Sequence, residues 1–310
     1  MSAAFVVFAY GEVGVRCLRV LLSAGVDVRL VVTHVDDPEE RRWFGSVAEL
    51  AADHGLPCIA PIDANDPQLI TSVTTLAPDF IFSFYYRFLL GPQLIAAARR
   101  GALNMHGSLL PKFRGRAPVN WAIVRGATET GATLHHMVTR ADAGDIVDQL
   151  AVPILQDDDA LAVFRKVALA AEIVLARSLP KLIDGSARAT PQRIVDGEYF
   201  GRRRPEDGRI DWSRPAQEIH NLVRAVAPPY PGAFAEVLGE QWMILRTRVL
   251  PRTMTVPVSR PRLTGANGRC IVDCADGQQL LLLSASTTRG PIDLASVSAQ
   301  LQRVPIELTS

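Results

Sequence analysis

The sequence carries almost no net charge. Its 33 lysine and arginine residues are balanced by 32 aspartate and glutamate residues, which gives a formal charge of +1 at pH 7. A chain so nearly neutral has no general attraction for polyanions, so its charge balance does not call for nucleic acid or an anionic membrane. We therefore expect its partners to be small molecules.

The sequence also lacks an apolar run long enough to span a membrane. The apolar segment AFVVFAY, residues 4–10, follows no basic region and precedes no small-residue cleavage site, so it is typical of a buried first strand and not of a signal peptide. Hydrophobic residues make up 48% of the chain and charged residues 21%, as in ordinary soluble globular proteins. These features predict a cytoplasmic protein without membrane insertion.

Cysteine is scarce, and its four positions indicate neither disulfides nor a metal site. Cys270 and Cys274 form a CxxxC pattern, but no histidine lies nearby to complete a zinc site. The adjacent His135 and His136 would face opposite sides of a strand, which argues against a metal shared between them. We expect four free thiols and no bound metal. We also expect His135 and His136, like His34, His54 and His220, to be ordinary surface or hydrogen-bonded residues.

A dinucleotide-binding fingerprint is missing as well. The turn after the first expected strand contains Gly11 and Gly14 without the GxGxxG spacing that brings backbone amides against a pyrophosphate. A tight strand-to-helix turn accounts for these glycines. A nucleotide-dependent oxidoreductase remains an alternative, which a titration with the nucleotide would test.

What the first two thirds of the sequence do contain is an alternation of short β-rich runs with longer segments of helical period. This alternation is the signature of a parallel sheet with crossover helices, and it predicts a Rossmann-like, doubly wound α/β domain. The expected strands are residues 4–10, 26–34, 57–60, 79–86 and 101–107, and the expected helices are 13–25, 46–55 and 67–77.

A long amphipathic helix is expected over residues 161–183, after an acidic segment that suits a helix N-terminus. Beyond it a polar, arginine-rich stretch interrupts the periodicity, and the later runs are short and strand-like. These runs predict a small OB-like β-barrel opened by one helix over residues 215–227. The predicted domains are 1–190 and 204–310, joined by a linker over 191–203.

Two polar side chains stand out in the strand GALNMHG, residues 101–107. Because side chains alternate along a strand, Leu103 and Met105 should face one side while Asn104 and His106 share the other. In an open α/β sheet the carboxyl ends of the strands line the ligand crevice. An amide there can donate to the oxyanion of a tetrahedral intermediate, and an imidazole can transfer a proton near neutral pH.

A histidine used in this way is usually oriented by a carboxylate, and the segment TRADAGDIVDQ offers Asp142, Asp145 and Asp148. Asp142 is the preferred candidate because the small residues Ala143 and Gly144 follow it directly, whereas the other two lie where a new strand begins. The pattern predicts acyl transfer. A structural, hydrogen-bonded histidine is the alternative interpretation.

The segments NMHGSLLPKFRGRAPVNWAI, residues 104–123, and TETGATLHHMVTRADAGDIV, residues 128–147, resemble those of the folate-dependent formyltransferases. The family pattern is Asn-x-His, SLLP, an RG pair and Asp-Ala-Gly, and all of it is present. The likeness extends over nearly the whole chain, since FSFYYRFLL, FGRRRPEDGRIDW and HNLVRAVAPPYPGAF also resemble the sugar N-formyltransferase branch. The nearest resemblance is to the formyltransferase part of the bifunctional enzyme that acts on UDP-4-amino-4-deoxy-L-arabinose in lipid A modification and polymyxin resistance.

This resemblance implies roles for individual residues. As catalytic residues, Asn104 would polarise the formyl carbonyl and hold the oxyanion, His106 would relay protons between the attacking amine and the leaving folate nitrogen, and Asp142 would orient His106 and raise its basicity. The implied formyl donor is N10-formyltetrahydrofolate. The implied folate contacts are Phe88, Leu89, Leu90, Arg116, Val138, Thr139, Arg140, Ala141 and Asp142. For Phe88, Leu89 and Leu90, core packing is the alternative.

The family includes members that act on tRNA and members that act on sugars. The near-zero charge and the acidic segment HVDDPEE, residues 34–40, argue against tRNA, and Gly107 stands where tRNA-acting members usually carry proline. We therefore expect a nucleotide-linked amino sugar as acceptor, most specifically UDP-4-amino-4-deoxy-L-arabinose, with methionyl-tRNA formyltransferase as the alternative. The resemblance ends with the formyltransferase part, so oxidation of UDP-glucuronic acid is not expected.

Basic residues gather in two loops. The loop with Lys112, Arg114 and Arg116 is either an anion site, with Arg116 as the preferred ligand contact, or a solvated basic turn. Ser108 before it either donates to an early intermediate or, as we prefer, caps the loop. The second loop could meet a diphosphate through guanidinium groups or pair with its own carboxylates; it contains Arg202, Arg203, Arg204 and Arg209. No heptad pattern indicates an oligomeric state.

Overall fold

The computed structural model describes residues 3–35, 43–251, 260–302 and 304–309. The chain forms two compact units, which are described separately below. The first unit consists of Met1–Pro118, Glu129–Pro153 and Phe164–Gly201, and the second consists of Val119–Thr128, Ile154–Val163 and Arg202–Ser310. The domain bounds expected from the sequence remain a prediction.

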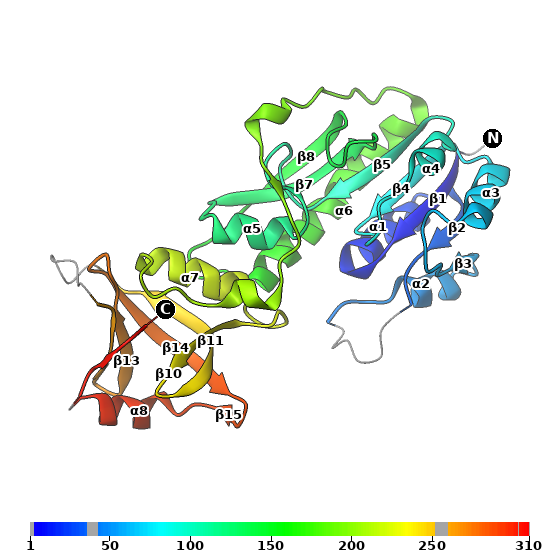
Figure 1. Ribbon diagram of the computed structural model, residues 1–310. Helices are drawn as coiled ribbons and strands as arrows, with labels where there is room; N and C mark the ends of the chain where they lie inside the picture. The colour runs from blue at the N-terminus through cyan, green and yellow to red at the C-terminus, as the bar shows by residue number, and fades with distance from the viewer. Residues whose placement is uncertain (1–2, 36–42, 252–259, 303, 310) are drawn as a thin grey trace. The chain divides into compact units, whose positions relative to one another are not determined.

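A seven-stranded sheet forms the centre of the first unit (Figure 1). Its strands are β1 (Ala4–Ala9), β2 (Asp27–Val32), β3 (Cys58–Ile59), β4 (Phe80–Phe84), β5 (Gly101–His106), β7 (Glu129–His136) and β8 (Ile146–Pro153). The strand order is β3-β2-β1-β4-β5-β7-β8. The first five strands of this order run parallel, while β7 pairs antiparallel with β5 and β8 antiparallel with β7.

The expected doubly wound α/β fold is therefore confirmed, with an antiparallel edge that the sequence pattern did not predict. All six residues of β1 are buried, as in a strand covered on both faces. The helices that cross between the strands are α1 (Gly11–Ser23), α2 (Val47–Asp53), α3 (Pro67–Leu76) and α4 (Pro92–Ala96), followed by the long α6 (Ala160–Asp184).

One apolar cluster shows how helices and sheet are held together. Val6 and Phe8 of β1 pack with Leu69 and Val73 of α3 and with Leu94 of α4. Capping residues fix the start of helix α3. The Asp66 carboxylate accepts hydrogen bonds from two backbone N–H groups of the first turn, and Pro67 is the first residue of the helix. Local capping and apolar periodicity thus fix the elements that carry the sheet.

The second unit contains an antiparallel sheet with the strand order β10-β11-β14-β13-β12-β16, and β15 pairs with β14. These strands are β10 (Ala233–Val237), β11 (Glu240–Val249), β12 (Arg262–Ala266), β13 (Arg269–Asp273), β14 (Gln279–Thr287), β15 (Gly290–Pro291) and β16 (Ile306–Glu307). The helices in this part of the chain are α5 (Pro118–Val124), α7 (Ala216–Ala225) and α8 (Leu294–Leu301).

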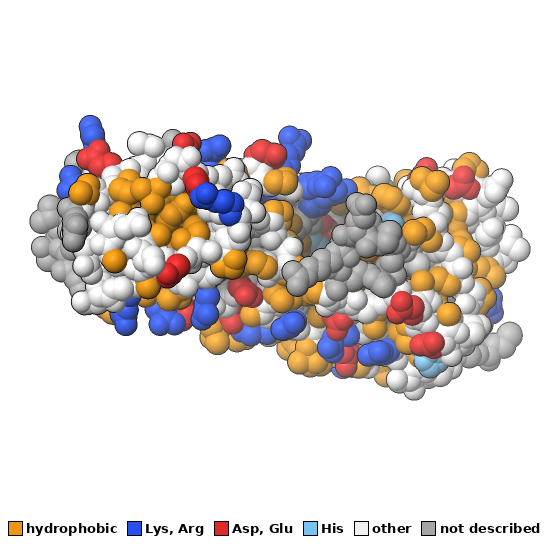
Figure 2. Space-filling model, turned by 90° about the horizontal axis from the view of Figure 1, so that it is seen from below, with side chains coloured by type: hydrophobic (Ala, Val, Ile, Leu, Met, Phe, Trp, Pro, Cys, Tyr) orange, Lys and Arg blue, Asp and Glu red, His pale blue; other side chains and the backbone are white. Residues whose placement is uncertain are grey.

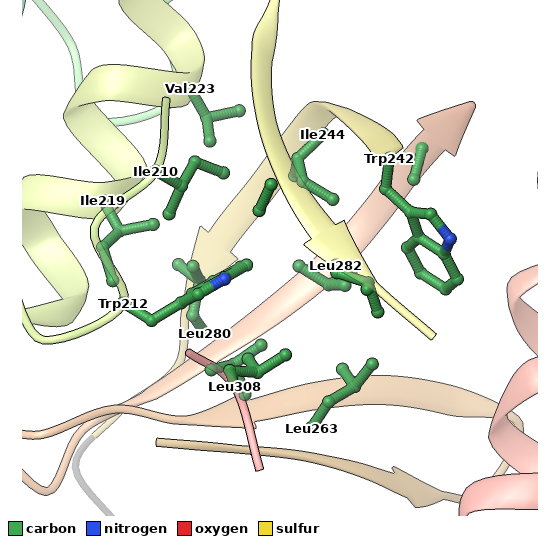
Figure 3. Close-up of a cluster of buried hydrophobic side chains, with 14 of the residues drawn as sticks. Ile210, Trp212, Ile219, Val223, Trp242, Ile244, Leu263, Leu280, Leu282 and Leu308 are labelled. Carbon is green, nitrogen blue, oxygen red and sulfur yellow. The ribbon is translucent and has the colours of Figure 1, made fainter. Parts of the chain in front are cut away.

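This sheet curls around its own apolar core, as Figure 3 shows. Trp212 and Trp242 are almost fully buried in it, together with Ile244 of β11 and Leu282 of β14. Ile219 and Val223 bring the apolar face of α7 into the same cluster. The expected small barrel-like domain is confirmed as a curled, antiparallel half-barrel.

An open pocket lies on the second unit. Figure 2 shows apolar side chains gathered on the visible face of this unit, at the left of the view. Arg289 and Glu240 form an ion pair within its lining. The lining residues are Leu238, Glu240, Trp242, Thr287, Arg289, Gly290, Pro291, Ile292 and Val297. This lining includes no histidine or cysteine.

Within the described part of the chain, no helix has both the length and the apolar character needed to cross a bilayer.

Candidate active site

Strand β5 and the neighbouring strand β7 place the central side chains of the site. Leu103 and Met105 of β5 are buried, and Asn104 and His106 occupy the alternate positions. Antiparallel pairing sets His135 of β7 directly opposite Asn104. Because directly paired residues of an antiparallel sheet point to the same face, an amide and two imidazoles share one face of the sheet here.

Asp142 reaches this face from the loop between β7 and β8. Its Oδ1 lies 3.5 Å from the Nδ1 of His106 and 3.7 Å from the Nε2 of His135. Its Oδ2 accepts a hydrogen bond of 2.9 Å from the backbone N–H of Gly115. The structure therefore brings together Asn104, His106 and Asp142, the three residues expected to be catalytic, and it adds His135 to them.

The loop that carries Asp142 is held in an unusual conformation. Asp142 has a φ of +53°, in the left-handed region that few residues other than glycine adopt. The side-chain amide of Gln192 donates hydrogen bonds to the carbonyl oxygens of Asp142, at 3.2 Å, and of Gly144, at 2.6 Å. A Cβ at Gly144 would overlap the carbonyl oxygen of His136, so only glycine allows this close approach.

His106 has a defined partner on each ring nitrogen. Its Nε2 lies 2.9 Å from the carbonyl oxygen of Phe113, which can only accept, so Nε2 carries a proton and donates it to this bond. Its Nδ1 is then the nitrogen that faces Asp142. A proton arriving at Nδ1 would lie between an imidazole and a carboxylate, which suits a residue that takes up and releases a proton.

His135 is a member of the site that the sequence did not identify. Its ring is almost fully buried, and this burial lowers its pKa to about 4, although the nearby Asp142 carboxylate acts in the opposite direction. The ring is therefore neutral at pH 7. The sequence shows only that residues 135 and 136 face opposite sides, because the pairing register that sets His135 against Asn104 depends on the folded sheet.

Side chains of the loop that follows β5 donate hydrogen bonds to main-chain carbonyl oxygens. The Ser108 hydroxyl donates to the carbonyl oxygen of Lys112 at 2.6 Å, which is the capping role expected for this residue. Arg114 is buried, and its guanidinium donates to the carbonyl oxygens of Gly197 at 3.0 Å and Ile194 at 3.5 Å. Of the basic residues in this loop, Arg114 thus has a structural partner, whereas Arg116 is exposed to solvent.

The residues expected to contact folate differ in exposure. Phe88, Leu89 and Val138 are exposed apolar side chains, and Arg140 is also exposed. Leu90 instead belongs to the apolar cluster behind the sheet, in agreement with the core-packing alternative. Exposed apolar side chains can cover a planar ring, so those of Phe88, Leu89 and Val138 are compatible with contacts to a folate.

An aromatic cluster occupies the carboxyl ends of β1, β2 and β4. The ring of His34 stacks on Tyr86 with 4.2 Å between centroids, and it meets the edges of Tyr10 and Phe88. The Arg87 guanidinium lies 4.4 Å from the Tyr10 ring centroid, and the Arg87 backbone N–H donates to the Nε2 of His34 at 3.0 Å. Burial, and then the Arg87 charge, lower the pKa of His34 to about 4.

Two of the four arginines of the second basic loop contact aromatic rings within the second unit. The Arg203 guanidinium lies 4.8 Å from the Trp121 ring centroid and donates to the carbonyl oxygen of Asp207 at 2.8 Å. Arg209 lies 5.3 Å from the ring centroid of Phe234. These two guanidinium groups are therefore partly engaged within the protein.

Two family models match this chain. The model described as formyl transferase matches residues 1–179, and the model described as formyl transferase, C-terminal domain, matches residues 203–296. The first match contains all of β1 to β8 and most of α6, and therefore Asn104, His106, His135 and Asp142.

Solved structures of similar fold come from several sources. WlaRD, a sugar 3N-formyl transferase studied in the presence of dTDP and 5-N-formyl-THF, has a TM-score of 0.72 at 19% identity, over 91% of this chain and 97% of that one. The N-formyltransferase of Helicobacter canadensis, in complex with folinic acid and dTDP-3-aminofucose, has a TM-score of 0.71 at 18% identity, over 91% and 99%. HypX of Aquifex aeolicus, in complex with tetrahydrofolic acid, has a TM-score of 0.61 at 16% identity, over 98% and 48%.

Proposed function

Because this chain belongs to the formyl transferase family, we propose that it transfers a formyl group from N10-formyltetrahydrofolate to the amine of a nucleotide-linked amino sugar. The observation that carries this proposal is the meeting of Asn104, His106 and Asp142 on one face of β5 and β7. Structurally similar proteins that bind formylfolates and dTDP or a dTDP-sugar support the same classes of donor and acceptor.

The reaction needs no serine or cysteine nucleophile, because an unprotonated amine is itself nucleophilic. The amine nitrogen attacks the formyl carbon, and the carbonyl oxygen becomes the oxyanion of a tetrahedral intermediate. The bond from that carbon to N10 then breaks, the amine proton passes to N10 through His106, and the products are a formamide and tetrahydrofolate. Proximity alone can supply several kcal/mol, with about 7–11 kcal/mol in the best-aligned model reactions.

Each of the three side chains has a role in these reaction steps. Asn104 presents amide N–H groups to the developing oxyanion, an interaction worth about 3–4 kcal/mol in comparable sites. His106 exchanges the proton, and Asp142 faces its Nδ1 so that the charged ring has a partner. The backbone N–H of Gly115 fixes the second carboxylate oxygen of Asp142 and so holds that partner in place.

The exposed side chains around the site fit a folate. Phe88, Leu89 and Val138 offer apolar surface to a flat pterin, and the exposed guanidinium groups of Arg116 and Arg140 fit the carboxylates of a glutamate tail. We assign the folate contacts to these residues together with Thr139, Ala141 and Asp142.

For the acceptor, we propose UDP-4-amino-4-deoxy-L-arabinose as the specific sugar nucleotide. The sequence resemblance points to it, and the net charge of +1 gives no support to a tRNA-binding surface.

The test is mass spectrometry of reactions that contain N10-formyltetrahydrofolate and a panel of UDP- and dTDP-linked amino sugars, with charged initiator tRNA alongside. We expect the mass of one formyl group to be added to an amino-sugar nucleotide, and UDP-4-amino-4-deoxy-L-arabinose to react fastest. The His106→Ala variant is the matched control for uncatalysed transfer. Formylation of the tRNA alone would overturn the sugar assignment.

A further inference from the structure

The ring of His135 contacts Asn104 in a way that the proposed reaction has not yet used. The Nε2 of His135 lies 3.1 Å from the Nδ2 of Asn104, between two strands whose register sets these residues opposite each other. His135 itself is 1% exposed, so neither solvent nor a substrate can replace this contact without opening the sheet face. It is therefore a permanent neighbour of the Asn104 amide.

The hydrogen-bond partner of the second ring nitrogen determines which nitrogen of His135 carries the proton. Its Nδ1 lies 2.9 Å from the carbonyl oxygen of His136, and a carbonyl oxygen can only accept a hydrogen bond. In a neutral imidazole with one proton, that proton must be on Nδ1, and Nε2 is left with a bare lone pair. The backbone of β7 thus sets the tautomer of the ring.

That lone pair in turn determines the orientation of the Asn104 side chain. An amide NH₂ group facing Nε2 forms a hydrogen bond, whereas the amide oxygen in the same place would face a second lone pair. We propose that His135 is a positioning residue that holds the Asn104 amide with one N–H bound and the other N–H free to donate to the formyl oxygen. This inference rests on the proposed function, since it is the formyl oxyanion that needs the donor.

The orientation of the Asn104 side-chain amide matters for the reaction. An asparagine turned by half a revolution would present its oxygen to the reaction centre, and an oxygen there repels the developing oxyanion instead of stabilising it. Because an imidazole with Nδ1 fixed to the main chain excludes this orientation, the site is arranged for the intermediate before the substrate binds. A small displacement of such a group can cost about a hundredfold in rate.

Two amide variants provide a matched pair. In His135→Gln the amide oxygen reaches close to the position of Nε2 and can still accept from Asn104, whereas the shorter side chain of His135→Asn ends near the position of Nδ1 and cannot. We expect kcat for formyl transfer to stay within about threefold in His135→Gln and to fall about ten- to a hundredfold in His135→Asn. KM for both substrates should stay within about twofold. Equal kcat values in the two variants, or a loss confined to KM, would overturn the proposal.

A double-mutant cycle separates positioning from a merely structural role. His135→Asn should slow the wild-type enzyme, but in the Asn104→Ala background it should change kcat by less than about twofold, because the group that it positions is gone. If the fold-losses in kcat of the two single variants multiply in the double variant, His135 acts independently of Asn104. If the wild-type protein formylates none of the acceptors, it is the proposed function that fails, and the cycle does not apply.

A measurement on the wild-type protein needs neither activity nor a variant that folds. In ¹⁵N-histidine spectra at pH 7, assigned through the bonds of each ring, His135 should show a protonated Nδ1 and an unprotonated Nε2. A proton on Nε2 would be directed at the Asp142 carboxylate, 3.7 Å away, and would leave Asn104 without its acceptor. This result would contradict the proposal.

Discussion

The Nδ1 of His106 lies 3.5 Å from the Oδ1 of Asp142, with 7% and 13% of the two side chains exposed. At this depth a carboxylate stabilises a neighbouring positive charge more strongly than it does at the surface. The other oxygen of Asp142 is bound to the backbone N–H of Gly115, so the carboxylate cannot turn away from the imidazole without losing that bond. The carboxylate is thus held in place beside the imidazole.

Asp142→Asn tests this relationship because it keeps the shape of the side chain and removes its charge. We expect kcat to fall about 10²- to 10⁴-fold and the pH optimum to move, while folate binding is retained. Rate profiles against pH, together with a folate titration, measure both effects. A variant whose profile follows that of the wild type would remove Asp142 from the mechanism.

Gly107, directly after His106, tests the packing around the site. A Cβ at residue 107 would overlap the hydroxyl oxygen of Tyr85, whose ring packs edge-on against Phe164 with 5.8 Å between centroids. We expect Gly107→Ala to lower the free energy of unfolding by about 1–3 kcal/mol, as overpacking does, and to reduce activity.

The matched control for Gly107 is the double variant Gly107→Ala with Tyr85→Phe, in which the overlapping oxygen is absent. Urea unfolding should show that it recovers part of the lost stability. If Gly107→Ala alone is as stable as the wild type, the contact with Tyr85 does not constrain this position.

Acid should destabilise the protein through two histidines. Burial lowers the folded-state pKa of both His34 and His135 from 6.5 to about 4. Between pH 6.5 and 4 the unfolded chain therefore binds more protons than the folded one, so the stability due to these neutral rings is complete above pH 6.5 and is lost as the pH falls toward 4.

His34→Phe gives the direct measurement of this effect, because it keeps a ring that can stack on Tyr86 and removes the titrating group. Urea unfolding at a series of pH values from 7 to 4 should show a shallower decline in the variant than in the wild type. Identical slopes would mean that His34 does not titrate as its burial indicates.

The sequence predicted much of the fold, because its information is local and periodic. The alternation of β-rich runs and helical segments gave the parallel strands of the first unit, and α6 was expected over residues 161–183 and is found over Ala160–Asp184. Helices α4, α5 and α8 were missed, since five to eight residues show little helical period. The equally short α2 was predicted because a glycine follows its apolar periodic residues.

Parts of the site depended on contacts that no short segment contains. Alternation along β5 paired Asn104 with His106, but the place of His135 depends on the register between β5 and β7. Arg114 could not be distinguished from a ligand-binding cation, because its partners are main-chain carbonyls about eighty residues further along the chain. The cluster around His34 likewise forms only when β1, β2 and β4 lie side by side.

The most direct test of the whole account is the single-turnover rate of formyl transfer from bound N10-formyltetrahydrofolate in Asn104→Ala and in His106→Ala. Both variants should fold and bind folate as the wild type does, and each should lose at least about a hundredfold in rate, because one lacks the oxyanion donor and the other the proton carrier. A rate close to that of the wild type in either variant would contradict the account.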